Sequence, residues 1–279
     1  MLTKSPNRTF RARGRKLELR RRPLVMGILN VTPDSFSDGG SYRNADDAVS
    51  AAIKMIAEGA DIIDVGGEST RPGHQPVDSR TELERVLPVI EMLAAKTEAT
   101  ISIDTSKAAI ATQALAAGAH IVNDVWGLSR DPGMAEAVAR AEAGVIIMHN
   151  RESTDGTLDI FAEMDGFFEE AVAKVTTAGA AADTIMLDPG IGFGKTLEQN
   201  LAIVGDLKRL NKSGYPVLLG ASRKSFIGKV SPSEPSERIG GSIVTTVLAA
   251  QAGVSVVRVH DVSAHVQALK VLEATDRQT

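Results

Sequence analysis

Carboxylates and amides recur in this chain where short apolar runs end. Asp104 follows TISI, Asn123 follows HIV and Asp188 follows TIML. A carboxylate accepts hydrogen bonds from ring N–H and amino groups, and an amide both donates and accepts. Together these three side chains would match the edge of a flat nitrogen heterocycle. Taken singly, each has a structural alternative, in which it caps the next helix or pairs with a lysine.

A second polar group, Arg258 and His260, ends the last apolar run before Asp261. A guanidinium grips phosphate oxygens through its planar fork, and a histidine supplies a hydrogen bond or a proton. Backbone N–H groups at the start of a following helix favour anions as well. We therefore expect an anionic group to dock here. The alternative is that His260 only braces Asp261.

Asn30 stands where the apolar residues 25–29 give way to the turn-rich residues 33–40. An amide oxygen at such a strand end can meet a metal ion or a substrate phosphate, or it can brace its own loop. The glycine-rich GIGFGK at residues 190–195 lacks the spacing of a Walker phosphate loop. We interpret it as backbone room for a planar ligand, over which Phe193 either lies or simply packs as a core residue.

The elements that position these residues alternate regularly. Apolar runs predict eight strands, and segments of helical periodicity follow them. Eight such units predict a closed TIM (β/α)8 barrel of the α/β class, and polar residues at every strand end favour it over an open doubly wound sheet. The expected strands are 25–29, 62–67, 100–104, 121–124, 145–149, 185–188, 217–221 and 255–259, and the expected helices 46–56, 81–96, 107–117, 132–143, 161–181, 197–210, 238–252 and 262–274.

Composition limits the classes of protein that fit. The 279 residues, 43% of them hydrophobic, suit one barrel domain at 23–279 after a basic extension at 1–22. That extension, with the single acid Glu18, is expected to be a solvated lead-in with a short strand at 16–22. The alternative is a targeting or nucleic-acid-binding arm.

Charge, hydropathy and cysteine content exclude further classes. The net charge of −4 gives no overall field for nucleic acid, and no run is long enough to span a membrane. The sequence contains no cysteine, which excludes disulfides and thiolate chemistry and suits a reducing compartment. We therefore expect a cytoplasmic protein whose partners are small molecules.

Seven segments of the chain together resemble one known family. They are GILNVTPDSFSDGG at 27–40, GGESTRPG at 66–73, SIDT at 102–105, VND at 122–124, DPGIGFGK at 188–195, GASRKSFIG at 220–228 and RVHDV at 258–262. In this order they closely resemble the signature segments of dihydropteroate synthases. The resemblance implies a (β/α)8 barrel that condenses 6-hydroxymethyl-7,8-dihydropterin diphosphate with 4-aminobenzoate, releases diphosphate with help from Mg²⁺, and forms a homodimer. It also implies that sulfonamides compete for the aminobenzoate site.

The same resemblance assigns roles residue by residue. It implies pterin binding by Asp104, Asn123, Met148, Asp188, Phe193, Gly220 and Lys224, diphosphate binding by Asn30, Arg258 and His260, and metal binding by Asn30. It implies 4-aminobenzoate binding by Phe36, Thr70, Arg71, Pro72 and Ser222. The residues expected to carry catalysis are Asp38, Arg71, Lys224, Arg258 and His260.

Two other functions remain open from the sequence. A methyltetrahydrofolate-dependent methyltransferase would share the Asp and Asn strand ends. It would not need a diphosphate clamp at Arg258 and His260, nor the loop at residues 32–40. A pterin-binding barrel without activity would be expected to lose its charged strand ends, and all of them are present.

Overall fold

The computed structural model describes residues 8–19, 22–32, 41–68 and 77–276, although the side chains of residues 8 and 41–44 are not described. Eight parallel strands form one sheet in the order β8-β7-β6-β5-β4-β3-β10-β9. The strands are β3 (Leu24–Asn30), β4 (Ile62–Gly66), β5 (Thr100–Asp104), β6 (Ile121–Asp124), β7 (Gly144–Met148), β8 (Ile185–Asp188), β9 (Leu218–Leu219) and β10 (Val256–Val259).

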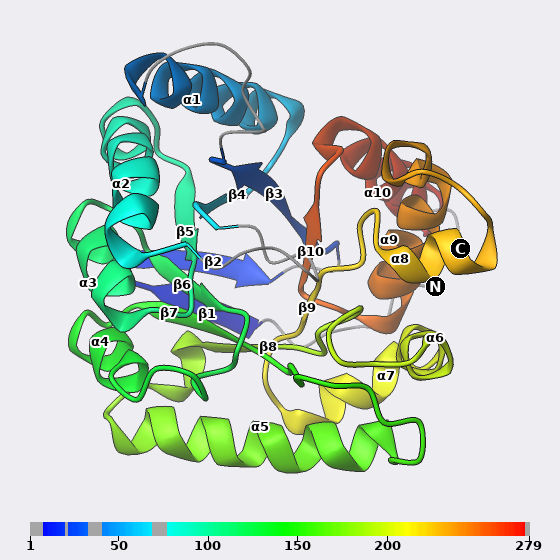
Figure 1. Cartoon of the computed structure of the whole chain (residues 1–279). Coiled ribbons are helices and arrows are strands. Elements are labelled where there is room, and N and C mark those ends of the chain that lie inside the picture. The colour runs from blue at the N-terminus through cyan, green and yellow to red at the C-terminus, as the bar shows by residue number, and fades with distance from the viewer. Residues whose placement is uncertain (1–7, 20–21, 33–40, 69–76, 277–279) are drawn as a thin grey trace.

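The sheet closes on itself between its two end strands. Leu187 of β8 forms a parallel bridge with Val217, just before β9, and the Leu187 N–H donates to the Pro216 carbonyl at 2.9 Å. The predicted TIM barrel is thereby confirmed (Figure 1). Closure matters for function because it gathers the carboxyl ends of all eight strands around one mouth.

Helices surround the barrel and cover the outer side of its strands (Figure 1). Local sequence explains several boundaries: Asp78 caps α2 through the Thr81 N–H, and Thr196 and Gln199 form a capping box on α6. The helices are α1 (Ser41–Glu58), α2 (Ser79–Lys96), α3 (Ala108–Ala116), α4 (Met134–Arg140), α5 (Ile160–Thr177), α6 (Leu197–Gly205), α7 (Leu207–Leu210), α8 (Ser225–Val230), α9 (Ile239–Ala252) and α10 (Val262–Asp276).

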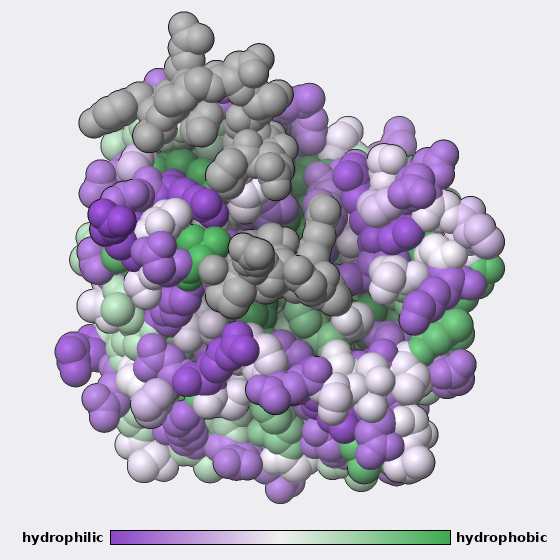
Figure 2. Space-filling view, in the orientation of Figure 1, coloured by the Kyte–Doolittle hydropathy of each residue, from purple (hydrophilic) through white to green (hydrophobic). Residues whose placement is uncertain are grey.

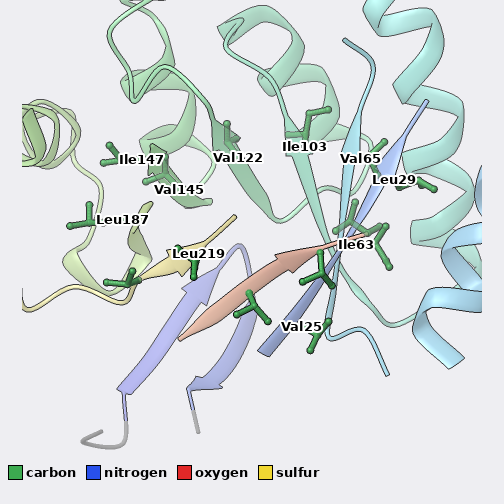
Figure 3. Close-up of a cluster of buried hydrophobic side chains, with 14 of the residues drawn as sticks. Val25, Leu29, Ile63, Val65, Ile103, Val122, Val145, Ile147, Leu187 and Leu219 are labelled. Atoms are coloured by element: carbon green, nitrogen blue, oxygen red, sulfur yellow. The ribbon is translucent and has the colours of Figure 1, made fainter. Parts of the chain in front are cut away.

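Strand residues divide between two cores, as the period of two requires. Val25 and Leu29 of β3 belong to a large cluster between barrel and helices, whose members from neighbouring strands are drawn in Figure 3. Met26 belongs to a smaller cluster with Ile62 and Ile146. Apolar side chains therefore fill most strand positions, although Asp64 of β4 and Ser102 of β5 are buried polar residues inside their strands.

An antiparallel hairpin, β1 (Arg8–Ala12) with β2 (Arg15–Leu19), adds Phe10, Ala12 and Leu19 to this smaller cluster. Phe10 is completely buried, and a Cβ added to Gly144 at the start of β7 would lie 2.7 Å from its ring. The hairpin therefore sits at the amino ends of the strands, opposite the mouth. The strand expected at 16–22 corresponds to β2, which pairs with β1 and not with the barrel sheet.

The outer surface is largely hydrophilic on the face shown in Figure 2, where hydrophobic residues form only small patches. None of the helices in the described ranges is long and apolar enough to cross a membrane.

Candidate active site

Three of the predicted residues meet in the interior of the barrel near its mouth. Arg258 reaches across from β10, where its Nε donates to Asp64 Oδ2 at 2.6 Å and its Nη2 donates to Asp104 Oδ2 at 2.7 Å. Asn123 of β6 donates from Nδ2 to the same Asp64 oxygen at 3.1 Å. One guanidinium thus bridges two carboxylates that are at least 94% buried.

Arg258 bonds to only one oxygen of each carboxylate. Within the described residues, Asp64 Oδ1 and Asp104 Oδ1 are buried and have no hydrogen-bond partner, and the same is true of Ser102 Oγ between them in β5. A buried acceptor without a donor is costly, so such a group points to a ligand that brings N–H groups. Burial raises the pKa of Asp104 to about 7, although the Arg258 charge opposes the shift.

A second wall comes from the ends of β8 and β9. Asp188 Oδ1 accepts the Gly190 N–H at 2.8 Å, and burial raises the pKa of this carboxyl group. The Lys224 ammonium lies 4.0 Å from the centre of the Phe193 ring, a cation–π contact. Three predicted pterin positions, from the ends of two neighbouring strands of the barrel, therefore share one wall of the mouth.

The glycine-rich turn at 190–195 has a structural role that the sequence interpretation did not include. Gly190 has φ +65°, and a Cβ there would lie 1.9 Å from the His149 carbonyl oxygen. Gly194 has φ +55°, and its Cβ would lie 2.5 Å from the Arg151 carbonyl. Both glycines make room for the neighbouring chain after β7, and the predicted room for a planar ligand stays a prediction.

The end of the site where diphosphate binding is predicted pairs Ser222 with His260. The two side chains are 3.1 Å apart at Oγ and Nδ1, and the His260 N–H donates to the same Oγ at 3.2 Å. Burial, followed by the charges of Arg258 and Arg223, lowers the pKa of His260 to about 3. The imidazole is therefore neutral at pH 7 and acts through hydrogen bonds. Asp261 pairs with Arg223 at 2.9 Å, so the described contacts do not show His260 bracing it.

Asn30 ends β3 beside the same mouth. It is paired in register with Gly66, and Gly66 is paired with Asp104. A Cβ added to Gly66 would lie 3.8 Å from both Asn30 Oδ1 and Asp104 Oδ2, so this glycine separates the predicted metal position from the buried carboxylates. Among the described residues, no three His, Cys, Asp or Glu side chains gather as metal ligands. A single amide oxygen fits a Mg²⁺ ion held mainly by substrate phosphates and water.

The remaining predicted positions divide into two sets. Met148 ends β7 in register with Asp188, and Gly220 lies close enough that its added Cβ would be 3.6 Å from Asp188 Oδ2. The other set falls outside the described residues, so its roles stay predictions; its members are Phe36, Asp38, Thr70, Arg71 and Pro72.

Sequence reasoning missed two ionic residues near this site. Asp64 was included in a predicted strand but not in the site, although a charge within the apolar run IIDVG was a usable signal. Lys107 donates to Glu82 at 2.5 Å, to Glu68 at 2.6 Å and to the Val77 carbonyl at 2.7 Å. Only the folded chain brings these groups together, so the sequence held no local signal for this cluster.

Comparison with known proteins identifies the family. A family model described as pterin binding enzyme matches residues 26–260. The dihydropteroate synthase of Escherichia coli K12 is 46% identical over 271 residues, which cover 95% of each chain. The chain belongs to the dihydropteroate synthase family. The expected resemblance is thereby confirmed.

Solved structures of dihydropteroate synthases agree with this fold. The Xanthomonas albilineans enzyme with 4-aminobenzoic acid is 44% identical and has a TM-score of 0.91, covering 96% of this chain and 98% of its own. The same enzyme in complex with 7,8-dihydropteroate is 42% identical with a TM-score of 0.88, over the same shares. The barrel described above is therefore the fold of dihydropteroate synthases over nearly its whole length.

Proposed function

We propose that this protein is a dihydropteroate synthase, a transferase that joins 6-hydroxymethyl-7,8-dihydropterin diphosphate to 4-aminobenzoate and releases diphosphate. The single observation that carries the proposal is the buried Asp64–Arg258–Asp104 bridge with its two free carboxylate oxygens, in a chain of this family. These oxygens suit the N–H-rich edge of a pterin.

The pterin ring would lie between the two walls of the mouth. Asp104 and Asp188 accept from its N–H and amino groups, and Asn123 holds Asp64 in place. Lys224 and Phe193 face each other on the second wall, so they offer a cation and an aromatic face to a flat ligand. Recognition would thus depend on groups fixed by strand ends before the ligand arrives.

The chemistry breaks the C–O bond between the pterin methylene and diphosphate, and the bond electrons leave with diphosphate. Positive charge then develops on the methylene and the conjugated ring, where the buried carboxylates stabilise it. The aniline nitrogen of 4-aminobenzoate attacks that carbon, forms the C–N bond and loses a proton. Asp38 is proposed to stabilise the cation, and Arg71 to help exclude water.

Departure of diphosphate needs positive and hydrogen-bonding groups at the other end of the substrate. In the tautomer in which Nδ1 accepts from the Ser222 hydroxyl, a neutral His260 carries its proton on Nε2, and we propose that this N–H donates to the diphosphate. We propose that Asn30 helps to hold Mg²⁺, which when bound neutralises charge on the diphosphate. Arg258 adds a permanent charge nearby, although two of its donors are committed to carboxylates here.

We also propose that the protein is a homodimer that pairs through α9 and α10. Val244 and Val271 are 57% and 60% exposed on these helices, and a groove of about 390 Å³ lies between them, lined by Ile243, Val247 and Leu272. Exposed apolar groups that gather on one face favour association. A second copy of the chain is the occupant that the resemblance implies.

The decisive test follows both products. Purified protein with dihydropterin diphosphate, 4-aminobenzoate and Mg²⁺ is expected to form diphosphate and dihydropteroate in equal amounts. Asp104→Asn removes a charge-assisted acceptor and should lower kcat/KM for the pterin by about 10- to 100-fold. Asp183→Asn is the matched control, because Asp183 pairs with Arg11 of the hairpin, away from the mouth. If the protein binds the pterin but forms neither product, the result would favour one of the alternatives, a methyltransferase or a non-catalytic barrel.

A further inference from the structure

Lys195 is a buried charge that the proposed chemistry does not use. It is only 6% exposed, and its ammonium donates to the carbonyl oxygens of Gly190 at 2.9 Å, Phe193 at 3.0 Å and His149 at 3.2 Å. A lysine ammonium has three N–H groups, so each one is occupied by a carbonyl. Burial lowers the pKa of Lys195 to about 7, against the pull of Asp188 and Glu163. A buried ammonium is costly, and an apolar side chain would serve a core better.

The three carbonyls belong to two different strand-end segments. Gly190 and Phe193 begin and end one turn, since the Phe193 N–H donates to the Gly190 carbonyl at 3.1 Å. His149 follows β7, the strand next to β8 in the barrel. The Lys195 ammonium therefore ties the turn after β8 to the chain after β7.

That turn contacts Asp188 of the proposed pterin wall at its start and contains Phe193 at its end. At its start the Gly190 N–H donates to Asp188 Oδ1 at 2.8 Å, and at its end the Phe193 ring lies 4.0 Å from the Lys224 ammonium. Asn200 of α6 holds the middle of the turn in place, because its Oδ1 accepts the Gly192 N–H at 2.7 Å. Both ends of the turn, which are the parts that touch the wall, depend on Lys195.

We propose that Lys195 is a positioning residue for pterin recognition, whose ammonium holds the turn at 190–193 against the chain after β7 and so sets the places of Asp188 and Phe193. The inference rests on the proposed function of those two residues in pterin binding. Lys195 acts through them, since carbonyls occupy all of its donors and none is left for substrate.

The test replaces the ammonium without shortening the stem much. Lys195→Met is expected to raise the Kd of dihydropterin diphosphate, measured by titration calorimetry with Mg²⁺, at least about tenfold. The KM for 4-aminobenzoate at saturating pterin should stay within about twofold, because the turn carries no predicted aminobenzoate position. Lys174→Met is the matched control: it makes the same substitution and removes a lysine hydrogen bond to the Leu128 carbonyl on the α5 side. Both constants should stay within about twofold in that variant.

Several outcomes would overturn the proposal. One is a folded Lys195→Met protein that binds the pterin as wild type does. Another is an equal loss of affinity for the pterin and for 4-aminobenzoate, which a merely structural role predicts. Lys195→Gln keeps two N–H groups, so its Kd for the pterin should lie between those of the wild type and Lys195→Met. If circular dichroism shows that neither variant folds, Lys195 is a stability residue and the proposal fails. Failure of the wild-type protein to bind the pterin would instead refute the proposed function.

Discussion

Arg258 carries one positive charge between two buried carboxylates, so the interior of the barrel holds an excess of negative charge when both acids are ionised. The protein relieves this excess by raising the pKa of Asp104 to about 7, with burial as the main cause. A bound pterin, whose N–H groups donate to the free oxygens, would relieve it in another way. Ligand binding and protonation should therefore compete at Asp104.

A pH profile tests that competition. The pKa of Asp104 is raised from 3.8, so the protonated form persists up to about pH 7 and is lost above it. Protonation removes an acceptor, and kcat/KM for the pterin should fall as the pH falls through about 7. His260, with its pKa lowered to about 3, should add no limb in this range. The profile should lose its acidic limb in Asp104→Asn, and a limb that survives there would assign it to another group.

The sequence located most of these side chains but not their directions. Asp104, Asn123 and Asp188 were predicted from their places at strand ends, and the barrel brings them to one mouth. Asp64 was not predicted as a site residue. Every residue of β4 is buried, so the sequence has no alternation of polar and apolar residues from which the direction of the Asp64 side chain could be predicted. The inward reach of Arg258 depends on contacts with β4 and β5, far away in the sequence.

At the scale of elements, the hairpin β1–β2 should contribute stability and not chemistry. Phe10→Ala removes a fully buried ring and should lower the free energy of unfolding by about 3–5 kcal/mol. Activity per folded molecule should be unchanged, because the mouth lies at the other end of the strands. Urea unfolding with parallel assays measures both quantities. Glu18→Ala, on the same hairpin but exposed, should change stability by less than about 0.5 kcal/mol.

The Lys107 cluster joins α2 to the chain on both sides of residues 69–76. Lys107→Met would leave Glu82, whose side chain is 2% exposed, without its cation. We expect the free energy of unfolding to fall by about 3 kcal/mol. This is the lower end of the range for breaking a buried ion pair, because the Lys107 side chain is itself 27% exposed. Thermal and urea unfolding would show it. Lys54→Met breaks a surface pair with Glu58 and should cost less than about 0.5 kcal/mol; an equal loss in both variants would contradict the argument.

Element boundaries followed the sequence where capping and periodicity agreed. The strands at 100–104, 121–124 and 185–188 were predicted with the observed bounds. The helix expected at 197–210 is interrupted at Asp206, which has φ −130° and ψ 51°, and the preceding Gly205 was a signal of this break that the prediction did not use. The six-residue helix α8 was missed because its sequence contains Gly228 and is too short for periodicity to show.

At the scale of the whole molecule, the exposed apolar face of α9 and α10 predicts association. Val244→Glu together with Val271→Glu should convert a dimer of the 29.4 kDa chain to a monomer, because each charge would be buried without a partner. Light scattering after gel filtration gives the mass. Ile53→Glu, an equally charged change at a 43% exposed position on α1, should leave the dimer intact. A wild-type protein that is already monomeric would refute the dimer proposal.

The hairpin that closes the amino end of the barrel also constrains the order in which the chain can fold. Arg11 pairs with Asp183, which is 172 residues further along, and the Arg13 N–H donates to the carbonyl of Glu142. Such distant contacts are slow to form, and a chain emerging from the ribosome begins at its N-terminus. The hairpin strands precede the barrel strands in the chain and are therefore made before the surface against which they dock. Phe10 shares its cluster with Leu218 and Val256, so its burial surface is incomplete until Val256 has been synthesised, and the nascent chain exposes the ring until then.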